Sequence, residues 1–294
     1  MPAHPRRTYT LQLAHGRSLE LGGRTLVMGI LNVTPDSFSD GGRFLDPMRA
    51  VDAALAMVDA GADLIDVGGE STRPGAPPVD EAEERARVLP VVSALAARLD
   101  VPISVDTRKA PVADAAIEAG ASILNDVSGL RSDAGLAAVA ARTGAGLVLM
   151  HMRGTSADMY RHATYADVVG EVASELAWSV EAAVNAGIAR QAIVIDPGLG
   201  FAKTAAHSWD VLRQLDDARF RAFDLPLLVG ASRKSFLQAA VGERPAGDRD
   251  PASLAAAAIA VLRGAHIVRV HDVDASVQAV RVADMMSAAD ASAM

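Results

Sequence analysis

Short aliphatic segments recur along the chain, and each of them follows a glycine that ends an amphipathic stretch. Four copies lie at Gly61–Asp66, Gly120–Asn125, Gly144–Leu149 and Gly264–Arg269. Glycine suits the left-handed residue that closes a helix, so a strand can follow it at once. The segments lack polar alternation, which is typical of parallel strands covered on both faces. The repeat therefore predicts units of a helix followed by a buried strand.

The repeat extends over the whole chain as eight expected strands with helices between them and after the last. The strands are expected near 26–31, 64–67, 103–106, 122–125, 147–150, 192–196, 226–230 and 266–270. One helical stripe consists of Val168, Val172, Leu176, Val180 and Val184. Eight such units predict an α/β fold, most simply a single (β/α)8 TIM barrel. A doubly wound sheet is the alternative, but its first strand should lead into G-x-G-x-x-G, and here it leads into Asn32–Asp36.

The domain organisation follows from this repeat. The chain has 294 residues, a length that suits one barrel domain. Residues 25–287 are expected to form the barrel. Residues 1–24 form an N-terminal extension, in which 8–24 resemble a hairpin that could cap the bottom of the barrel. Residues 288–294 are expected to be a frayed tail.

Composition excludes several classes of protein. The formal net charge of −8 argues against binding to nucleic acid or to an anionic membrane surface. The absence of cysteine excludes disulfides, thiolate zinc sites and cysteine nucleophiles. No apolar run approaches the roughly 20 residues that span a bilayer, and Met1–Arg7 has no apolar core behind it. We therefore expect a cytoplasmic protein without nucleic-acid or membrane partners.

Polar side chains follow the expected strands at the point where each strand ends. They include Asn32, Asp106, Asn125, Asp126, Asp196, Arg269 and His271. One such residue could equally be structural, bonded to the amide of a neighbouring loop. The carboxyl ends of barrel strands meet at one face, however, and catalytic groups of barrel enzymes lie there. The whole set therefore predicts a site at that face.

The predicted site contains two kinds of group. Asp106, Asn125 and Asp196 are hydrogen-bond acceptors, whereas Lys234, Arg269 and His271 are basic. This division predicts a ligand with one N–H-donating end and one anionic end. Lysine is itself uncommon here, because only Lys109, Lys203 and Lys234 occur among 28 basic residues. A lysine retained in such a chain can serve chemistry, although chance is the simpler explanation for any one of them.

Four loops add detail to this face. Residues 32–42 are expected to form a mobile lid, or otherwise an ordinary surface loop. Residues 68–75 place hydroxyls and Arg73 between glycines, which suits an anion. Asp196–Phe201 is a turn that presents an aromatic ring. Residues 230–235 precede a helical run, whose first amides favour an anion.

Seven motifs of this chain resemble those of the dihydropteroate synthase family, in the same order and at barrel spacing. They are Asn32–Gly42, Gly69–Gly75, Ser104–Thr107, Asn125-Asp126, Asp196–Phe201, Ser232–Ser235 and Arg269–His271. The resemblance covers about residues 26–285. It implies a pterin-binding transferase of folate biosynthesis that joins p-aminobenzoate to (7,8-dihydropterin-6-yl)methyl diphosphate and releases diphosphate.

The resemblance also implies a role for each matching residue. Asp106, Asn125 and Asp196 would bind the pterin, with Lys234 on its acceptor side. Arg269 and His271 would bind the diphosphate together with Thr72 and Arg73, and Asn32 would hold Mg²⁺ on it. The p-aminobenzoate would lie among Thr72, Arg73, Pro74, Phe201 and Ser235. Lys234, Arg269 and His271 would be the catalytic residues.

Further expectations come from the same resemblance. It implies a homodimer and sensitivity to sulfonamides, which mimic p-aminobenzoate. Two alternatives stay open. A pterin-binding methyltransferase acting on a corrinoid partner would share the acceptors but would have no diphosphate for Ser232–Ser235 and Arg269–His271 to hold. A non-catalytic pterin-binding relative should show decay in the loop motifs.

Overall fold

Eight parallel strands form the centre of the molecule in a computed structural model that describes residues 6–34, 47–71 and 75–291. Their order is β8-β7-β6-β5-β4-β3-β10-β9. The strands are β3 (Leu26–Asn32), β4 (Leu64–Gly68), β5 (Ile103–Asp106), β6 (Ile123–Asp126), β7 (Gly146–Met150), β8 (Ile193–Asp196), β9 (Leu228–Val229) and β10 (Ile267–Val270).

The two edge strands of this sheet meet and close it into a barrel. Ile195 bridges to Leu227, and the Ile195 amide donates to the carbonyl of Pro226 at 3.0 Å. Strand β9 is shorter than the predicted 226–230. At its start Pro226 has no N–H to donate to a ladder, and the Leu227 amide donates to His266 Nδ1 at 3.1 Å. The predicted (β/α)8 barrel is confirmed.

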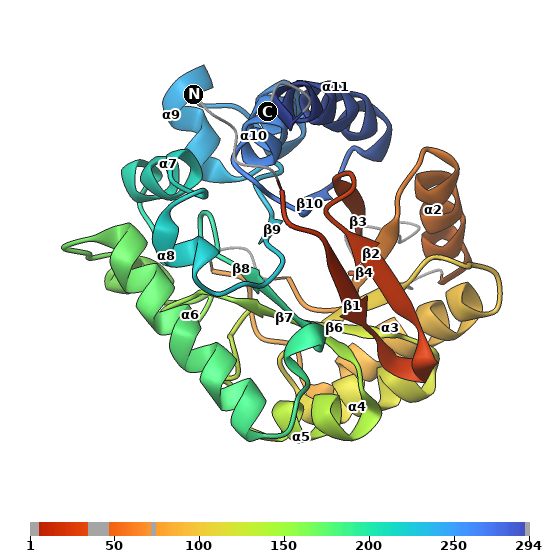
Figure 1. Cartoon of the computed structure of the whole chain (residues 1–294). Helices are drawn as coiled ribbons and strands as arrows, with labels where there is room; N and C mark the ends of the chain where they lie inside the picture. Colours follow the sequence, from red (N-terminus) through yellow and green to blue (C-terminus); the bar gives the residue numbers. More distant parts are fainter. Residues whose placement is uncertain (1–5, 35–46, 72–74, 292–294) are drawn as a thin grey trace.

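Helices surround the strands as an outer ring (Figure 1). They are α2 (Pro47–Asp59), α3 (Glu81–Ala96), α4 (Ala110–Glu118), α5 (Gly135–Thr143), α6 (Val168–Asn185), α7 (Ala205–Arg213), α8 (Ala218–Arg221), α9 (Gln238–Val241), α10 (Asp250–Leu262) and α11 (Val273–Ala291). Helix α11 continues into residues 288–291, part of the segment that we expected to be frayed.

Helix α6 shows why these segments become helices. The side chain of Asp167 accepts a hydrogen bond from the amide of Gly170 and caps the first turn. Val168, Val172, Leu176 and Val180 then form one buried stripe. Val184, the last residue of the predicted stripe, is 42% exposed because it lies in the final turn of the helix.

The alternation of side chains along each strand separates the two surfaces of the barrel wall. In β4, Ile65 and Val67 belong to the large apolar cluster that includes the outer helices, whereas Leu64 belongs to the inner cluster. The inner cluster also contains Leu26, Met28, Ile123, Val148, Val194, Leu228 and Ile267. Continuing the alternation places Asp66, two residues after Leu64, inside the barrel above this apolar layer.

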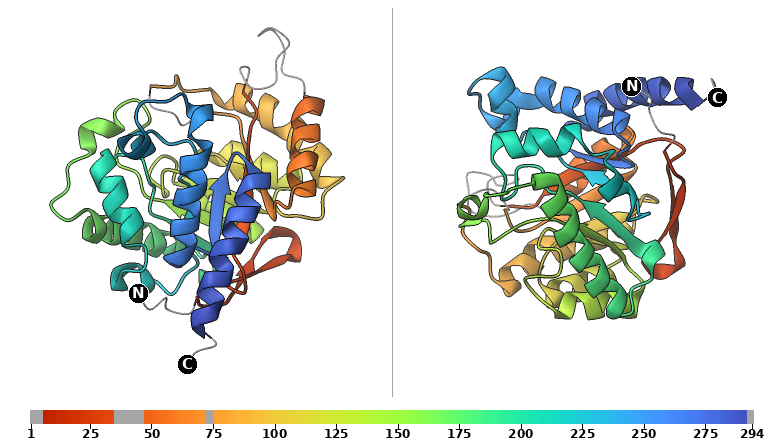
Figure 2. Two further views of the ribbon diagram at one scale, coloured as in Figure 1. Left: turned by 90° about the horizontal axis from the view of Figure 1, so that it is seen from above. Right: turned by 60° about the vertical axis from the view of Figure 1, so that its left-hand side comes forward.

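The predicted N-terminal hairpin is confirmed and closes one end of the barrel. Strands β1 (Tyr9–Gln12) and β2 (Ser18–Leu21) pair in antiparallel fashion, and Leu11, Leu13 and Leu21 pack into the inner cluster. Figure 2 (right) shows the hairpin, in red, at the end of the barrel that faces right in this view. Within the described ranges, no helix is long and apolar enough to cross a bilayer.

Candidate active site

A buried polar network joins four strands above the apolar layer of the barrel. The Arg269 guanidinium on β10 donates from Nε to Asp66 Oδ2 at 2.6 Å and from Nη2 to Asp106 Oδ2 at 3.0 Å. Asn125 donates from Nδ2 to Asp66 Oδ2 at 2.9 Å. Three predicted site residues therefore meet in one network. They do not divide into an acceptor flank and a cationic flank, because Arg269 lies between two carboxylates.

Asp66 is a member of this network that the sequence analysis did not select. It is completely buried on β4 and accepts hydrogen bonds from Ser104 Oγ at 2.6 Å, Asn125 and Arg269. The sequence could have indicated Asp66 by its position two residues after Leu64. Strand alternation puts both residues on the inner face of the barrel. A carboxylate there needs a partner with positive charge, and Arg269 provides it.

Burial and Arg269 act in opposite directions on the pKa of Asp106. Burial raises the pKa of this carboxyl group, and the neighbouring guanidinium counteracts part of the increase. The charged carboxylate is therefore less stable here than on an exposed aspartate, and Arg269 opposes this effect. Asp126, the next motif carboxylate, holds its own turn instead, because it accepts from the amides of Ser128 at 2.8 Å and Leu130 at 2.6 Å.

Asp196 and Lys234 form the second part of the site. Asp196 is buried at the end of β8 and accepts from the Gly198 amide at 2.7 Å. Burial raises its pKa, and the charge of Lys234 opposes that effect. Burial lowers the pKa of Lys234 to about 8, and Asp196 opposes that shift in turn. The two groups thus stabilise each other's charged form.

Lys234 also contacts the turn that follows β8. Its Nζ donates to the carbonyl of Leu199 at 2.5 Å and lies 4.3 Å from the centre of the Phe201 ring. A cation at this distance from an aromatic face is attracted to it. The predicted pterin residue Lys234 and the predicted aminobenzoate residue Phe201 are therefore direct neighbours.

His271 is oriented by Ser232 from the neighbouring strand end. Ser232 Oγ lies 2.9 Å from His271 Nδ1 and accepts from the His271 amide at 3.2 Å. When the serine hydroxyl donates to Nδ1, the imidazole carries its proton on Nε2, which can then donate to an anion.

The segment after Ser232 is anchored to helix α10. Arg233 adopts a positive φ of 59° and donates from Nε and Nη2 to Asp250, both at 2.7 Å. Its amide also donates to Ser253 Oγ at 2.8 Å. The predicted helix start is present as η4 (Ser235–Leu237) followed by α9, and Ser235 is exposed there.

Part of the predicted site cannot be placed. Thr72, Arg73 and Pro74 lie outside the described residues, as do residues 35–42 of the predicted lid. Asn32 ends β3 beside Gly68 of the next strand. Lys109, the third lysine, pairs with Glu70 and Glu84 outside the network around Arg269.

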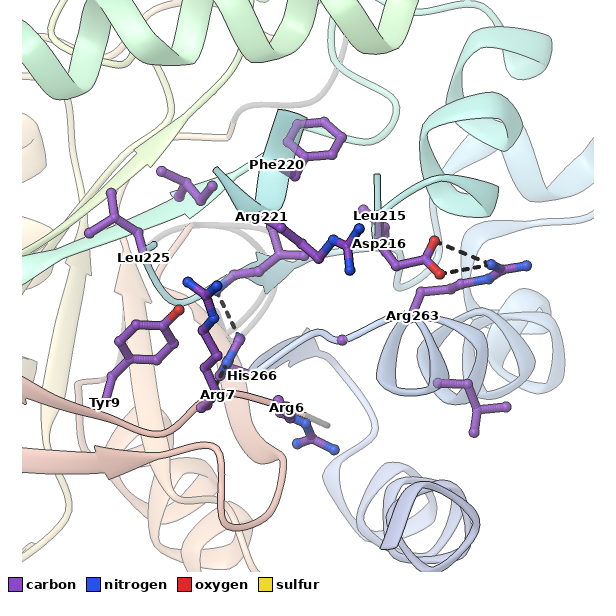
Figure 3. Close-up of a pocket in the computed structure, with 14 residues that line it drawn as sticks. Arg6, Arg7, Tyr9, Leu215, Asp216, Phe220, Arg221, Leu225, Arg263 and His266 are labelled. Atoms are coloured by element: carbon purple, nitrogen blue, oxygen red, sulfur yellow. Dashed lines mark hydrogen bonds and ion pairs between the residues drawn. The ribbon is translucent and has the colours of Figure 1, made fainter. Parts of the chain in front are cut away.

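A separate cavity of about 250 Å³ lies beside the N-terminal hairpin (Figure 3). Arg6, Arg7 and Arg263 contribute to its wall, but each is paired with a carboxylate, respectively Asp284, Asp224 and Asp216. Its wall also includes Ile195 and Leu227, whose bridge closes the barrel, and none of the predicted site residues within the described part of the chain. The cavity is therefore separate from the polar network around Arg269.

A model of the pterin-binding enzyme family matches residues 28–271, which include the whole polar network. The chain therefore belongs to the pterin-binding enzymes. The barrel and its inward-facing acceptors agree with this class. The match extends from β3 to the residue that follows β10, and so covers every barrel strand except the first two residues of β3.

Comparison with curated relatives narrows the class. The chain is 50% identical over 262 residues to the dihydropteroate synthase of Mycobacterium leprae, covering 87% of this chain and 91% of that one. It is 53% identical over 259 residues to a probable bifunctional folylpolyglutamate synthase/dihydropteroate synthase of Haloferax volcanii, covering 88% of this chain. It spans only 30% of the length of that bifunctional relative.

Solved structures agree with these relatives. The Yersinia pestis dihydropteroate synthase, solved with a sulfonamide drug, superposes with a TM-score of 0.88 at 45% identity, covering 95% of this chain and 100% of that one. The Burkholderia cenocepacia enzyme, solved with 7,8-dihydropteroate, gives 0.84 at 42% identity, covering 96% and 97%. Within the pterin-binding enzymes, the chain belongs to the dihydropteroate synthase family of transferases in folate biosynthesis.

Proposed function

We propose that this protein condenses p-aminobenzoate with (7,8-dihydropterin-6-yl)methyl diphosphate to give 7,8-dihydropteroate and diphosphate. The observation that carries the proposal is the network of Asp66, Asp106, Asn125 and Arg269 inside the barrel. It offers carboxylate and amide acceptors to a ring with several N–H donors. The related Burkholderia cenocepacia enzyme was solved with the proposed product, which supports the same choice of ligand.

The pterin would be held by acceptors that the fold has already taken out of water. Asp106, Asn125 and Asp196 would accept from its amino and ring N–H groups, and Lys234 would donate to its acceptor side. Hydrogen bonds to charged groups are worth about 1.5–3 kcal/mol each. A buried site of this kind can reject an analogue that lacks the donors by about 10⁴-fold.

The chemistry would be departure of the leaving group followed by amine attack. The C–O bond to diphosphate breaks, and the electron-rich pterin stabilises the cation on the methylene carbon. The amine nitrogen of p-aminobenzoate then forms the C–N bond and loses one proton to solvent. Arg269 and His271 would neutralise charge on the departing oxygens. The predicted loop over 32–42 would exclude water, which otherwise competes for the cation.

The residues around Asn32 suit the Mg²⁺ that the family resemblance implies. A Cβ on Gly68 would lie 3.9 Å from both Asn32 Oδ1 and Asp106 Oδ2, so these two oxygens face one small space. Magnesium takes oxygen ligands and is commonly held by one or two side chains, waters and substrate phosphates. The described part of the chain contains no cluster of three or more His, Asp or Glu suited to a metal. Asn32 would therefore hold an ion that the diphosphate carries, and the ion would neutralise charge on the leaving group.

The p-aminobenzoate would bind between Phe201 and the exposed start of the 235–241 helical segment. Phe201 supplies an aromatic face 4.3 Å from Lys234, and Ser235 supplies a hydroxyl for the carboxylate. Thr72, Arg73 and Pro74 would complete this end of the site. Because sulfonamides mimic p-aminobenzoate, we expect them to compete at this position.

An apolar surface on α10 and α11 supports the proposed homodimer. Ile259 and Leu262 on α10 and Val282, Met285 and Met286 on α11 are all at least 39% exposed. The two helices lie side by side (Figure 2, left). Large exposed apolar patches mark interaction surfaces. The apolar sequence Ala255–Ala260 on α10 could also contribute to such an interface, but Ala256, Ala257 and Ala260 are buried and face the barrel. The cytoplasmic location stays a prediction.

One assay tests the activity directly. The protein is mixed with the pterin diphosphate, p-aminobenzoate and Mg²⁺, and both diphosphate release and dihydropteroate formation are followed. We expect equal amounts of the two products. Tight pterin binding without product would favour a non-catalytic relative. Methyl transfer from a methylated folate to a corrinoid protein, without condensation, would favour the methyltransferase alternative.

A further inference from the structure

Lys203 is a completely buried lysine to which neither the sequence motifs nor the proposed mechanism assigns a role. It lies in the segment that connects β8 with α7, directly before Thr204, the N-cap of α7, and only 2% of it is exposed. Its ammonium has three polar neighbours, which are His151 Nδ1 at 2.9 Å, the Gly198 carbonyl at 3.0 Å and the Phe201 carbonyl at 3.2 Å. All three belong to or border the turn Asp196–Phe201.

The number and placement of these acceptors suit an ammonium. A lysine ammonium carries its three N–H donors on one nitrogen atom, whereas a guanidinium is planar and larger. Arginine is the usual basic residue in this chain, and only three of its 28 basic residues are lysines. A lysine at a completely buried position with three acceptors around it therefore has a geometric reason to be lysine.

The acceptors are themselves held in place. His151 Nε2 lies 3.2 Å from Glu175 Oε2, and Arg153 Nε donates to Glu175 Oε1 at 2.9 Å. Burial lowers the pKa of His151 to about 4, so its neutral ring can accept from Lys203 at Nδ1 while donating from Nε2 to Glu175. A chain of polar contacts thus runs from Arg153 at the surface of the barrel to the buried ammonium.

The turn that Lys203 contacts has an unusual backbone that needs such support. Gly198 has a φ of +67°, and a Cβ there would lie 2.0 Å from the carbonyl oxygen of His151. Ala202 has a φ of 48°, and its carbonyl accepts from the Tyr165 hydroxyl at 2.9 Å. Two carbonyls of this turn, those of Gly198 and Phe201, are buried acceptors that the Lys203 Nζ satisfies.

Lys203 and Lys234 contact different groups of the same turn. Lys203 binds the Gly198 and Phe201 carbonyls, whereas Lys234 binds the Leu199 carbonyl and faces the Phe201 ring. Asp196, at the start of the turn, is held by the pairing of β8 with β7. It also accepts from the amide of Gly198, a residue whose carbonyl Lys203 contacts. Phe201, at the other end of the turn, lies beyond this strand pairing, and its carbonyl accepts from Lys203.

We propose that Lys203 is a positioning residue that sets the Phe201 ring for p-aminobenzoate while leaving the pterin end of the site largely unaffected. The inference rests on the proposed function, because it takes Phe201 as part of the aminobenzoate site. A positioning role differs from a merely structural role in its effect on the two substrates. Loss of the ammonium should weaken p-aminobenzoate binding much more than pterin binding.

The test compares Lys203→Met with Leu136→Ala, a cavity variant in α5. Leu136 is completely buried and belongs to the large outer cluster, so its loss lowers stability without contacting the turn. We expect Lys203→Met to raise the KM for p-aminobenzoate by at least about tenfold, since small misplacements of positioning groups have large kinetic effects. The Kd of the pterin diphosphate, measured by calorimetry, should change by less than about threefold, because Asp106 and Asn125 belong to the network around Arg269 and are not misplaced. Leu136→Ala should change neither the KM for p-aminobenzoate nor the Kd of the pterin diphosphate by more than about threefold.

A rescue experiment uses the absence of cysteine from this chain. Lys203→Cys provides a single thiol, which 2-bromoethylamine converts in denaturant to aminoethylcysteine, a side chain that restores the ammonium. After refolding, beside wild-type protein taken through the same cycle, this protein should recover a near-native KM for p-aminobenzoate. Unmodified Lys203→Cys should not. Where Lys203→Met does not fold, Lys203→Gln, which keeps two N–H donors, replaces it.

Hydrogen exchange provides a measurement that does not depend on activity. The amides of residues 198–203 should exchange faster in Lys203→Met and at the native rate in Leu136→Ala. An inactive wild-type protein would contradict the proposed function, and the exchange result would still test whether Lys203 holds the turn. Equal effects of Lys203→Met on both substrates, or unchanged exchange in the turn, would overturn the inference.

Discussion

Single residues in this site act through the partners that burial gives them. Arg269 shows this most clearly, because it binds both Asp66 and Asp106. Removing one member of a buried ion pair typically costs about 3–5 kcal/mol, since the remaining charge is left without a partner. Arg269→Ala would therefore disturb the pterin acceptors together with the diphosphate end, and it cannot separate the two roles.

His271→Ala tests the diphosphate end more selectively, because it removes neither Arg269 nor the two carboxylates that Arg269 binds. We expect kcat to fall by about 10²–10³-fold, the usual effect of removing one donor to a developing anion. The Kd of the pterin, measured by calorimetry with a pterin lacking the diphosphate, should stay within about threefold. Asp196→Asn should show the opposite pattern, with weaker pterin binding. Equal losses of binding and turnover in His271→Ala would contradict the assignment.

Lys234 should give the reaction an alkaline limit. Burial lowers its pKa to about 8, and the ammonium is the form that contacts Leu199 and Phe201. As pH rises through about 8 the free enzyme loses this charge, so we expect kcat/KM to fall there. Lys234→Arg, whose guanidinium stays charged, should have a lower rate without this decline. A pH profile that is the same in both proteins would be the contrary result.

The same pKa has an opposite consequence for stability. The unfolded chain keeps the Lys234 proton up to its ordinary pKa of 10.5, whereas the folded protein releases it near 8. Between these values the unfolded state binds more protons, so the contribution of this group to the free energy of unfolding rises with pH. The site thus retains a charged lysine at neutral pH at a cost in stability.

At the scale of elements, caps and strand ends determine where each unit stops. Helix α3 begins after Asp80, whose side chain accepts from the Glu83 amide at 2.8 Å. Strand β9 begins only at Leu228, because Pro226 has no N–H and the Leu227 amide donates to His266 Nδ1. These local rules were readable in the sequence, and the predicted strands agree with the observed ones within about two residues.

Asp80→Ala should lower the free energy of unfolding by about 0.5–2 kcal/mol, since it leaves the Glu83 amide without its cap. Asp80→Asn keeps an acceptor at the same position and should lose much less. Urea denaturation followed by circular dichroism measures both. The cap lies outside the polar network, so kcat should be unchanged in each variant. A loss in Asp80→Asn as large as in Asp80→Ala would mean that charge, not capping, is responsible.

At the scale of the whole molecule, the α10–α11 face sets the expected assembly. Its apolar residues are exposed in the single chain, and Met285 is the most exposed of them at 73%. We expect Met285→Glu to shift the protein from dimer to monomer, since it places a charge within an apolar interface. Light scattering across a concentration series measures the mass. The control is Trp178→Glu on α6, which also replaces an exposed hydrophobic residue by an acidic one. This variant should not alter the mass.

The sequence by itself determined the repeat of helix and strand, the closed α/β barrel, the hairpin and the polar residues at the strand ends. These features depend on local periodicity, on glycine and on the rule that parallel strands end at one face. Tertiary structure alone decided which of those polar residues meet. Asp66 entered the network because the alternation of its strand turns it inward, and Lys203 became important because a turn far from His151 in sequence folds against it. Such contacts join residues separated by tens to hundreds of positions, and no local pattern records them.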